Sequence, residues 1–217
     1  MTAVGLRPAR GHDGSVAVKK RWNHNIHYHP FVLDALPPSC DRVLDVGCGE
    51  GLLTFELSRR VGRVTAIDRD APIVEVARRD AAADTIDYVV GDVLDHPFVS
   101  GSFDAVVLLA TLHHVDLAEA LGRLRDLLRP GGTLVAVGLA DTRLPADLPY
   151  EIAGAVSTRV HRLMKNYGEV SAPMVWPPPT TFAEARRIAT EVLPGVRYRR
   201  HILWRYSLVW TKPDATS

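Results

Sequence analysis

The sequence predicts an α/β fold in which a mostly parallel sheet is covered by helices on both faces. The first observation is the alternation of short apolar runs with helical segments along residues 42–139, where the first three runs end at glycine or aspartate. The second is a change of pattern near the C-terminus. The runs 196–203 and 206–211 leave no room for a helix between them, so we expect an antiparallel hairpin at the edge of the sheet.

Turn and capping residues bound the elements of the first half. The Pro37-Pro38 pair ends a short N-terminal helix, and Asp70 can cap a helix that has Pro72 in its first turn. The run 42–46 is short and almost entirely apolar, which favours a strand buried on both faces. In order, we expect a helix over 21–37, a strand over 42–46, a helix over 50–60, a strand over 61–67, a helix from 71 to about 83 and a strand over 86–90.

The second half continues the pattern and then departs from it. After a strand over 103–110, Asp116 and Glu119 form a capping pair for a helix that Pro130 and the two following glycines end. A fifth strand over 133–139 leads into a long insert, residues 140–181, and such inserts are typical of lids or substrate loops. The insert contains an amphipathic stretch over about 150–167, and a helix over 182–192 follows it.

Composition limits the class of protein. The chain has 217 residues, 47% hydrophobic and 24% charged, which is typical of a globular domain and excludes a disordered chain. We expect one domain over 21–212, with a flexible arm over 1–20 and a tail over 213–217. No apolar run approaches the roughly 18 residues of a membrane span, and no secretory signal opens the chain. The expected localisation is cytoplasmic, with Cys40 and Cys48 as free thiols.

The net charge of +1 gives no global field that would recruit nucleic acid or an anionic membrane, so neither partner is expected. The arginines at 197, 199, 200 and 205 form a local basic cluster, which a solvated edge strand explains better than RNA binding. The sequence does not fix the oligomeric state, and a homodimer stays open.

A glycine-rich loop is the most informative feature. Gly47, Gly49 and Gly51 follow a predicted strand and open a helix, where glycine permits a tight turn with positive φ and close approach of a ligand to the backbone. Asp68 ends the second strand, where a carboxylate can accept both hydroxyls of a ribose. Asp92 ends the third strand, where it can meet the exocyclic amine of an adenine. Each acid alone can also be a helix cap or a solvated turn residue.

The loop departs from the dinucleotide fingerprint Gly-x-Gly-x-x-Gly. Its third glycine falls one position early, at Gly51, so that Leu52 stands where the fingerprint has glycine. Glu50 adds an acidic group that suits a bound pyrophosphate poorly. These differences argue against NAD or FAD and favour a cationic or zwitterionic ligand.

Five motifs together resemble the class I S-adenosylmethionine-dependent methyltransferases of the small-molecule type, with motifs like those of the ubiquinone and menaquinone methyltransferases. The motifs do not indicate which acceptor is methylated. The resemblance covers about residues 40–140 and lies in the segments 43–51, 64–68, 89–92, 103–108 and 128–135. It implies a Rossmann-like seven-stranded sheet in the order 3-2-1-4-5-7-6 with strand 7 antiparallel. It also implies S-adenosyl-L-methionine as methyl donor and S-adenosyl-L-homocysteine as product.

The resemblance further implies roles for matching residues. Asp68 would hold the ribose with Arg69 alongside the adenine, and Asp92 with the backbone of Val93 would read the adenine edge. The positions implied to contact the methionine part of the donor are Asp45, Gly47, Cys48, Gly49, Leu109 and Ala110, the last two facing its amine.

His113 and His114 follow the fourth strand and are the candidate general bases, since an imidazole can accept a proton near neutral pH. The alternative is that they only orient the start of the next helix. In the N-terminal segment, His24 and Tyr28 would share a helical face and form a lid over the donor or acceptor. The alternatives are a helix that only caps the fold and a zinc or iron site, which would need a third ligand; no metal is assigned.

Trp176 lies in a proline-rich loop and is either a wall of the acceptor pocket or a buried anchor for that loop. The sequence therefore predicts methyl transfer to an O, N or C centre of a small-molecule acceptor. A non-catalytic protein that binds an adenosyl ligand and, less favoured, a Rossmann NAD-dependent oxidoreductase are the alternatives.

Overall fold

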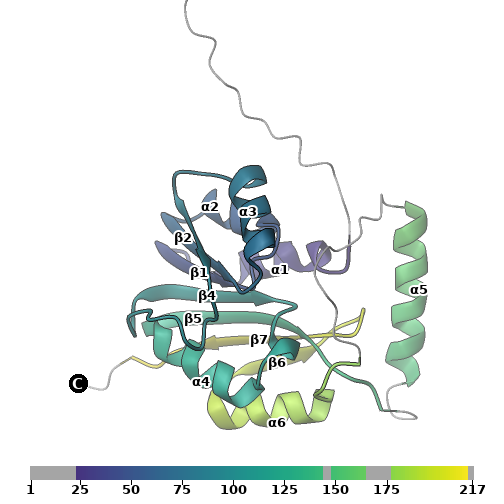
Figure 1. Ribbon diagram of the computed structural model, residues 1–217. Helices are drawn as coiled ribbons and strands as arrows, with labels where there is room; N and C mark the ends of the chain where they lie inside the picture. The colour runs from purple at the N-terminus through teal and green to yellow at the C-terminus, as the bar shows by residue number, and fades with distance from the viewer. Residues whose placement is uncertain (1–22, 144–147, 165–176, 215–217) are drawn as a thin grey trace, which may run out of the picture.

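The computed structural model describes residues 23–143, 148–164 and 177–214. Within this part of the chain, seven strands form one sheet in the order β3-β2-β1-β4-β5-β7-β6 (Figure 1). Strand β7 pairs antiparallel with both β5 and β6, and the other neighbouring strands pair in parallel. This is the strand order that the methyltransferase resemblance implies, so the predicted fold class is confirmed.

The elements lie close to their expected positions. The strands are β1 (Arg42–Val46), β2 (Arg63–Asp68), β3 (Ile86–Val90), β4 (Phe103–Leu109), β5 (Leu128–Leu139), β6 (Arg197–Arg200) and β7 (Arg205–Thr211). The helices are η1 (Ile26–Tyr28), α1 (His29–Asp34), α2 (Leu52–Ser58), α3 (Ala71–Asp80), η2 (Leu112–His114), α4 (Leu117–Leu127), α5 (Leu148–Met164) and α6 (Phe182–Val192).

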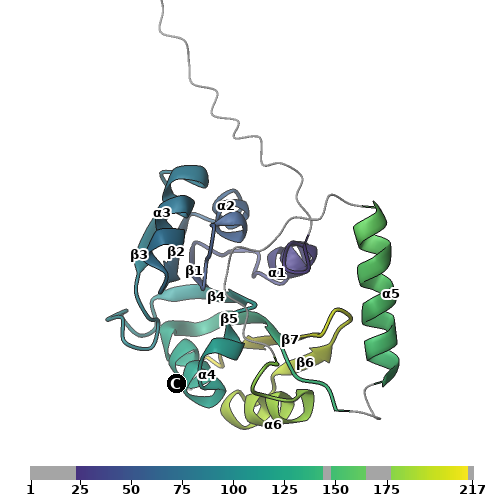
Figure 2. The same ribbon diagram turned by 45° about the vertical axis from the view of Figure 1, so that its right-hand side comes forward.

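The core has two halves, one on each face of the sheet. Successive residues of a strand point to opposite faces, and accordingly Val43 packs with α1 and α2 whereas Leu44 packs with α4 and α6. Figures 1 and 2 show these two pairs of helices on opposite sides of the sheet. Because both faces are covered, the central strands are almost entirely apolar, as the sequence predicts.

The N-terminal helix is shorter than expected over 21–37. The side-chain oxygen of Asn23 accepts hydrogen bonds from the backbone N–H groups of Asn25 and Ile26, at 2.9 and 2.8 Å. This local bond holds the chain in a turn instead of a helix at that point. A 3₁₀ turn then leads into α1, so His24 precedes the helical segment.

Strand β5 begins five residues earlier than expected. Helix α4 ends at Leu127, and the Pro130-Gly-Gly segment lies within β5 instead of separating helix from strand. The pairing with β4 is irregular there, since Phe103 pairs with Leu128 and Ala105 with Thr133. An irregularity of this kind accommodates a proline that has no N–H to donate.

The terminal hairpin is confirmed, with a longer turn than expected, since β6 ends at Arg200 and β7 begins at Arg205. Leu203 and Trp204 both have positive φ, 62° and 57°, and they reverse the chain between β6 and β7. Helix α5 lies beside the tip of this hairpin (Figure 2), where the indole of Trp204 comes within 3.3 Å of a Cβ position built on Gly154. Among the described helices, none is both long and apolar enough to cross a membrane.

Candidate active site

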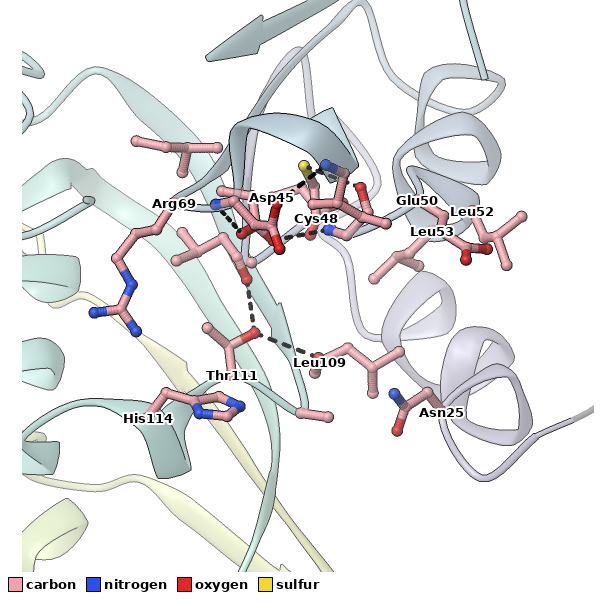
Figure 3. Close-up of a pocket in the computed structure, with 18 of the residues that line it drawn as sticks. Asn25, Asp45, Cys48, Glu50, Leu52, Leu53, Arg69, Leu109, Thr111 and His114 are labelled. Atoms are coloured by element: carbon pink, nitrogen blue, oxygen red, sulfur yellow. Dashed lines mark hydrogen bonds between the residues drawn. The ribbon is translucent and has the colours of Figure 1, made fainter. Parts of the chain in front are cut away.

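A cavity of about 500 Å³ lies at the carboxyl ends of β1, β2 and β4 (Figure 3). Pockets for small ligands typically span about 300–1,000 Å³. All of the predicted donor-contact positions line it: Asp45, Gly47, Cys48, Gly49, Asp68, Arg69, Asp92, Val93, Leu109 and Ala110. The parallel strands place their ends at one edge of the sheet, and this brings together residues that are up to 65 positions apart in the chain.

The glycine loop has the geometry that the sequence predicts. Gly47, Gly49 and Gly51 have φ values of 74°, 52° and 77°, in the left-handed region that favours glycine. A Cβ on Gly47 would lie 2.2 Å from the Oγ1 of Thr111, whereas a Cβ on Gly49 would meet no atom within 4 Å. Gly47 is therefore required by close packing, while Gly49 leaves its backbone accessible from the cavity.

Asp68 is fixed by the loop that it faces. Its Oδ2 accepts the backbone N–H of Gly49 at 2.9 Å, and its Oδ1 accepts that of Asp70 at 3.0 Å. A carboxylate offers about four acceptor sites, so two bonds to the backbone leave further lone pairs for a ligand. Asp68 is therefore held in a fixed orientation beside the glycine loop, with lone pairs left to accept hydrogen bonds from a ligand.

Asp45 lies at the base of the cavity and is almost completely buried. Burial raises the pKa of its carboxyl to about 6, although the hydroxyl of Thr54 donates to it at 2.6 Å and His29 lies close enough to lower the pKa. A buried carboxylate destabilises a fold unless a partner compensates it. The stability of the folded protein alone would thus favour a neutral side chain at position 45, yet the residue there is an acid.

The end of β3 contributes the third acid. Asp92 accepts the N–H of Leu94 at 3.0 Å through Oδ1, and its Oδ2 lies 3.5 Å from a guanidinium nitrogen of Arg69. Both side chains line the cavity beside Val93. Cys48 also lines it, but burial raises the pKa of its thiol, so it stays protonated and is no nucleophile. Cys40 and Cys48 are both free, as expected.

Thr111 is a residue of the site that was not predicted. Thr111 follows β4 and donates its hydroxyl to the carbonyl of Val46 at 3.0 Å, which ties the end of β4 to the end of β1. Ala110, the preceding residue, has a φ of 59°. The role of Thr111 could not be recognised from the sequence, because it depends on packing against Gly47 at the end of the neighbouring strand β1.

The two neighbouring histidines have different surroundings: His114 lines the cavity, whereas His113 is buried outside it. His114 lines the cavity, and burial lowers its pKa, with Arg69 adding to the lowering. His113 does not line the cavity. It is 8% exposed, its ring centroid is 4.0 Å from that of His114, and burial lowers its pKa to about 4. The position of His113 outside the cavity lining therefore gives its prediction as a base no support, since a base must come within hydrogen-bond reach of the substrate.

The N-terminal segment covers the cavity with different residues from those predicted. Asn23, Asn25, Ile26 and His29 line it, whereas His24 and Tyr28 do not. The hydroxyl of Tyr28 donates to the carbonyl of Ile202 at 2.6 Å, so this side chain ties the segment to the hairpin turn.

His24 lies beside α5, where its Nε2 is 3.4 Å from the hydroxyl of Thr158. The prediction that His24 and Tyr28 face a ligand gains no support from the structure, because the turn at Asn23 and the 3₁₀ geometry point other side chains of this segment toward the cavity. In the described ranges no three His, Cys, Asp or Glu side chains are grouped as a metal site. Trp176 lies outside the described residues.

Sequence comparison finds methyltransferases. The methyltransferase domain family matches residues 44–136. A Mycobacterium tuberculosis protein described as an uncharacterized methyltransferase is 39% identical over 193 residues, which are 88% of this chain and 98% of that protein. A ubiquinone biosynthesis O-methyltransferase from Xanthomonas axonopodis is 40% identical over 129 residues, covering 58% of this chain and 53% of that enzyme.

Solved structures share the fold at lower identity. A Haloferax volcanii methyltransferase in complex with the Trm112 activator has a TM-score of 0.63 at 20% identity, covering 88% of this chain and 91% of that one. Geranyl diphosphate C-methyltransferase from Streptomyces coelicolor, solved with S-adenosyl-L-homocysteine, has a TM-score of 0.61 at 18% identity, covering 86% and 77%.

The [4+2]-cyclase SpnF has a TM-score of 0.63 at 16% identity, covering 87% and 82%. The fold therefore also occurs in a protein named for a different reaction. The identity and coverage of the mycobacterial relative, together with the strand order and the motif series, show that this chain belongs to the class I S-adenosylmethionine-dependent methyltransferase superfamily.

Proposed function

We propose that this protein transfers a methyl group from S-adenosyl-L-methionine to an O, N or C centre of a small-molecule acceptor. The observation that carries the proposal is the arrangement of Asp68 and the glycine loop, because the carboxylate is held by two backbone N–H groups and still has lone pairs for a ribose diol. The accessible backbone at Gly49 beside it suits a ligand that lies against the loop.

The charges of the cavity support this donor. Asp45, Glu50, Asp68 and Asp92 all line it. Opposite charges attract most strongly where the surroundings exclude water, so these acids favour a ligand with a sulfonium and an amine. They disfavour a pyrophosphate, which agrees with the departure of the loop from the dinucleotide fingerprint.

The donor, when bound, supplies a methyl group that is already activated by the positive sulfur. The protein then has to align the acceptor and exclude water, and such positioning can contribute about 7–11 kcal/mol. His114 is the candidate general base, since it lines the cavity and its lowered pKa keeps the imidazole neutral and able to accept a proton near pH 7.

The relatives support a small acceptor. The names of two of them specify ubiquinone synthesis and geranyl diphosphate methylation, and a cavity of about 500 Å³ suits a donor together with an acceptor of limited size.

Calorimetry with S-adenosylmethionine, S-adenosylhomocysteine and NADH tests the donor assignment. We expect micromolar binding of both adenosyl ligands and none of NADH. Asp68→Ala should weaken donor binding by roughly 1–3 kcal/mol through lost charged hydrogen bonds, and Asp87→Ala, which removes an exposed acid on β3, is the matched control. The donor assignment fails if neither adenosyl ligand binds, or if Asp68→Ala binds as well as the control.

Methyl transfer is then measured over a panel of phenols, amines and carbon nucleophiles. Turnover of any member supports an enzyme. Tight donor binding without turnover across the panel would favour the alternative, a non-catalytic adenosyl-ligand-binding protein.

A further inference from the structure

The cavity has two walls of different charge. The glycine loop and the ends of β2 and β3 contribute its acids, as described above. On the other side, the N-terminal segment and the end of β4 contribute Asn25, Ile26, Leu109 and Thr111, which carry no charge. The same segment contributes His29, whose Nδ1 lies 3.1 Å from the carboxylate of Glu56. This second side of the cavity therefore carries no acid, and its polar groups define which acceptor it can hold.

A buried arginine, Arg205, contacts this side of the cavity from within the protein. Arg205 is the first residue of β7 and pairs with Leu139, the last residue of β5, so it lies at the carboxyl edge of the sheet. It is 5% exposed. Its guanidinium donates to the side-chain oxygen of Asn25 at 2.8 Å and to the carbonyl of Leu203 at 3.3 Å.

This contact fixes the orientation of the Asn25 amide. Arginine can only donate hydrogen bonds, so the oxygen of Asn25 must face Arg205. The amide NH₂ is then left to donate elsewhere, and Figure 3 shows the Asn25 nitrogen turned toward Leu109, within the group of cavity-lining side chains. The bond links residues 180 positions apart and sets a hydrogen-bond donor into the cavity.

The charge of Arg205 strengthens this donor. A cation bound to the amide oxygen polarises the amide and makes its N–H groups better donors. The same charge reaches the neighbouring histidine behind the wall, since Arg205 adds to the lowering of the pKa of His113 that burial and His114 produce. A guanidinium therefore lies directly behind the side of the cavity that Asn25 lines.

We propose that Asn25, positioned by Arg205, is a specificity-determining hydrogen-bond donor for an oxygen anion of the methyl acceptor. The acceptor class is accordingly a phenolate, enolate or carboxylate-bearing compound and not an amine. The proposal rests on the proposed methyltransferase function, because it takes the acidic wall as the donor side of the cavity.

The test uses 4-nitrophenol and 4-nitroaniline, two probes of similar shape of which only the first forms an oxygen anion. Each is titrated into the protein saturated with S-adenosylhomocysteine, and the absorbance of the nitrophenolate reports the ionised form directly. We expect wild-type protein to bind nitrophenolate at least about tenfold more tightly than nitroaniline, because a hydrogen bond to a charged group contributes about 1.5–3 kcal/mol.

Variants identify the residues responsible. Asn25→Ala and Arg205→Met should remove most of this preference, and the affinity for S-adenosylhomocysteine should stay within about twofold of wild type. Arg199→Met removes an exposed arginine from β6 and is the matched control, expected to keep the preference. If Arg205→Met does not fold, Asn25→Asp serves instead, since its carboxylate should repel nitrophenolate without removing the side chain.

The outcomes separate this proposal from the proposed function. Equal affinity for the two probes in a protein that binds S-adenosylhomocysteine would overturn the acceptor assignment alone. An equal loss of S-adenosylhomocysteine and nitrophenolate binding in Asn25→Ala would also overturn it, because Asn25 would then serve the carboxylate of the donor. Failure of wild-type protein to bind S-adenosylhomocysteine would overturn the donor assignment and this proposal together.

Discussion

Replacement of Asp45 by asparagine should stabilise the folded protein while it weakens donor binding. The carboxyl is buried and its pKa is raised to about 6. Asparagine removes the charge and keeps an oxygen that can accept the hydrogen bond from Thr54. The side chain lines the cavity, so water there can reach the new amide NH₂.

The magnitude follows from the difference between the folded and unfolded pKa values. An unfolded Asp has a pKa of about 3.9, and each unit of difference corresponds to about 1.4 kcal/mol, so the charged form destabilises the fold by roughly 3 kcal/mol. An imperfectly solvated amide would offset roughly 1 kcal/mol or more of this gain. We therefore expect Asp45→Asn to gain about 1–2 kcal/mol at pH 7.5, or roughly 2–4 °C in Tm for each kcal/mol.

The sign of the pH dependence is a sharper test than the gain itself. Because the folded pKa is raised, the folded state of the wild type binds more protons than the unfolded state between about pH 4 and pH 6. The wild type therefore loses stability from this group as the pH rises through that window. The part of the advantage that comes from the charge should be about 0.5 kcal/mol at pH 4, about 1 kcal/mol at pH 4.5 and complete above about pH 7.

Urea unfolding of both proteins from pH 4.5 to 8 measures this difference, and calorimetry measures the affinity for S-adenosylmethionine. Asp87→Asn, on the exposed edge strand β3, controls for the loss of any negative charge. A variant that is less stable than the wild type at pH 7.5, or whose stability difference from the wild type is the same at pH 4.5 and 7.5, would refute the assignment of Asp45 as a destabilising buried carboxylate.

Three further predictions concern the loop, the base and the N-terminal segment. Gly47→Ala should lose more than about 1 kcal/mol of stability, because its φ is positive and its Cβ would clash with Thr111; Thr111→Ala in the same chain should restore part of the loss in urea unfolding. His114→Gln should lower kcat by about 10²–10⁴-fold if the imidazole is the general base, with unchanged donor affinity by calorimetry. Tyr28→Phe should lose about 1 kcal/mol in thermal unfolding, because the carbonyl of Ile202 loses its hydrogen-bond donor.

Each of these has a contrary result. Wild-type stability of Gly47→Ala would mean that the loop can move away from β4. Full turnover in His114→Gln would leave the imidazole with a structural role. An unchanged melting temperature in Tyr28→Phe would mean that the hydroxyl contributes nothing to holding the N-terminal segment against the hairpin.

The glycine loop and the acids that follow it could be predicted because they depend on local geometry. Gly47 and Gly49 are needed by a turn that spans only a few residues. Asp68 and Asp92 follow the ends of parallel strands, which meet at the same edge of any parallel sheet. Position in the strand pattern is therefore enough to place these side chains around one cavity.

The N-terminal segment could not be placed in the same way. The prediction for His24 and Tyr28 assumed a regular helix, and the two hydrogen bonds that the Asn23 side chain accepts delay that helix and turn different residues toward the cavity. An α-helix turns by about 100° per residue. If the helix begins a residue or two later than expected, a different set of side chains therefore points toward the ligand.

By itself, the sequence determined the strand order through its motif series, the glycine loop, and the family to which the chain belongs. Only the tertiary structure decided that Thr111 packs on Gly47, that His114 and not His113 reaches the cavity, and that Arg205 holds Asn25. The reason is the range of the interactions. Strands, turns and caps follow from neighbours along the chain, whereas these contacts join residues up to 180 positions apart that only the closed sheet brings together.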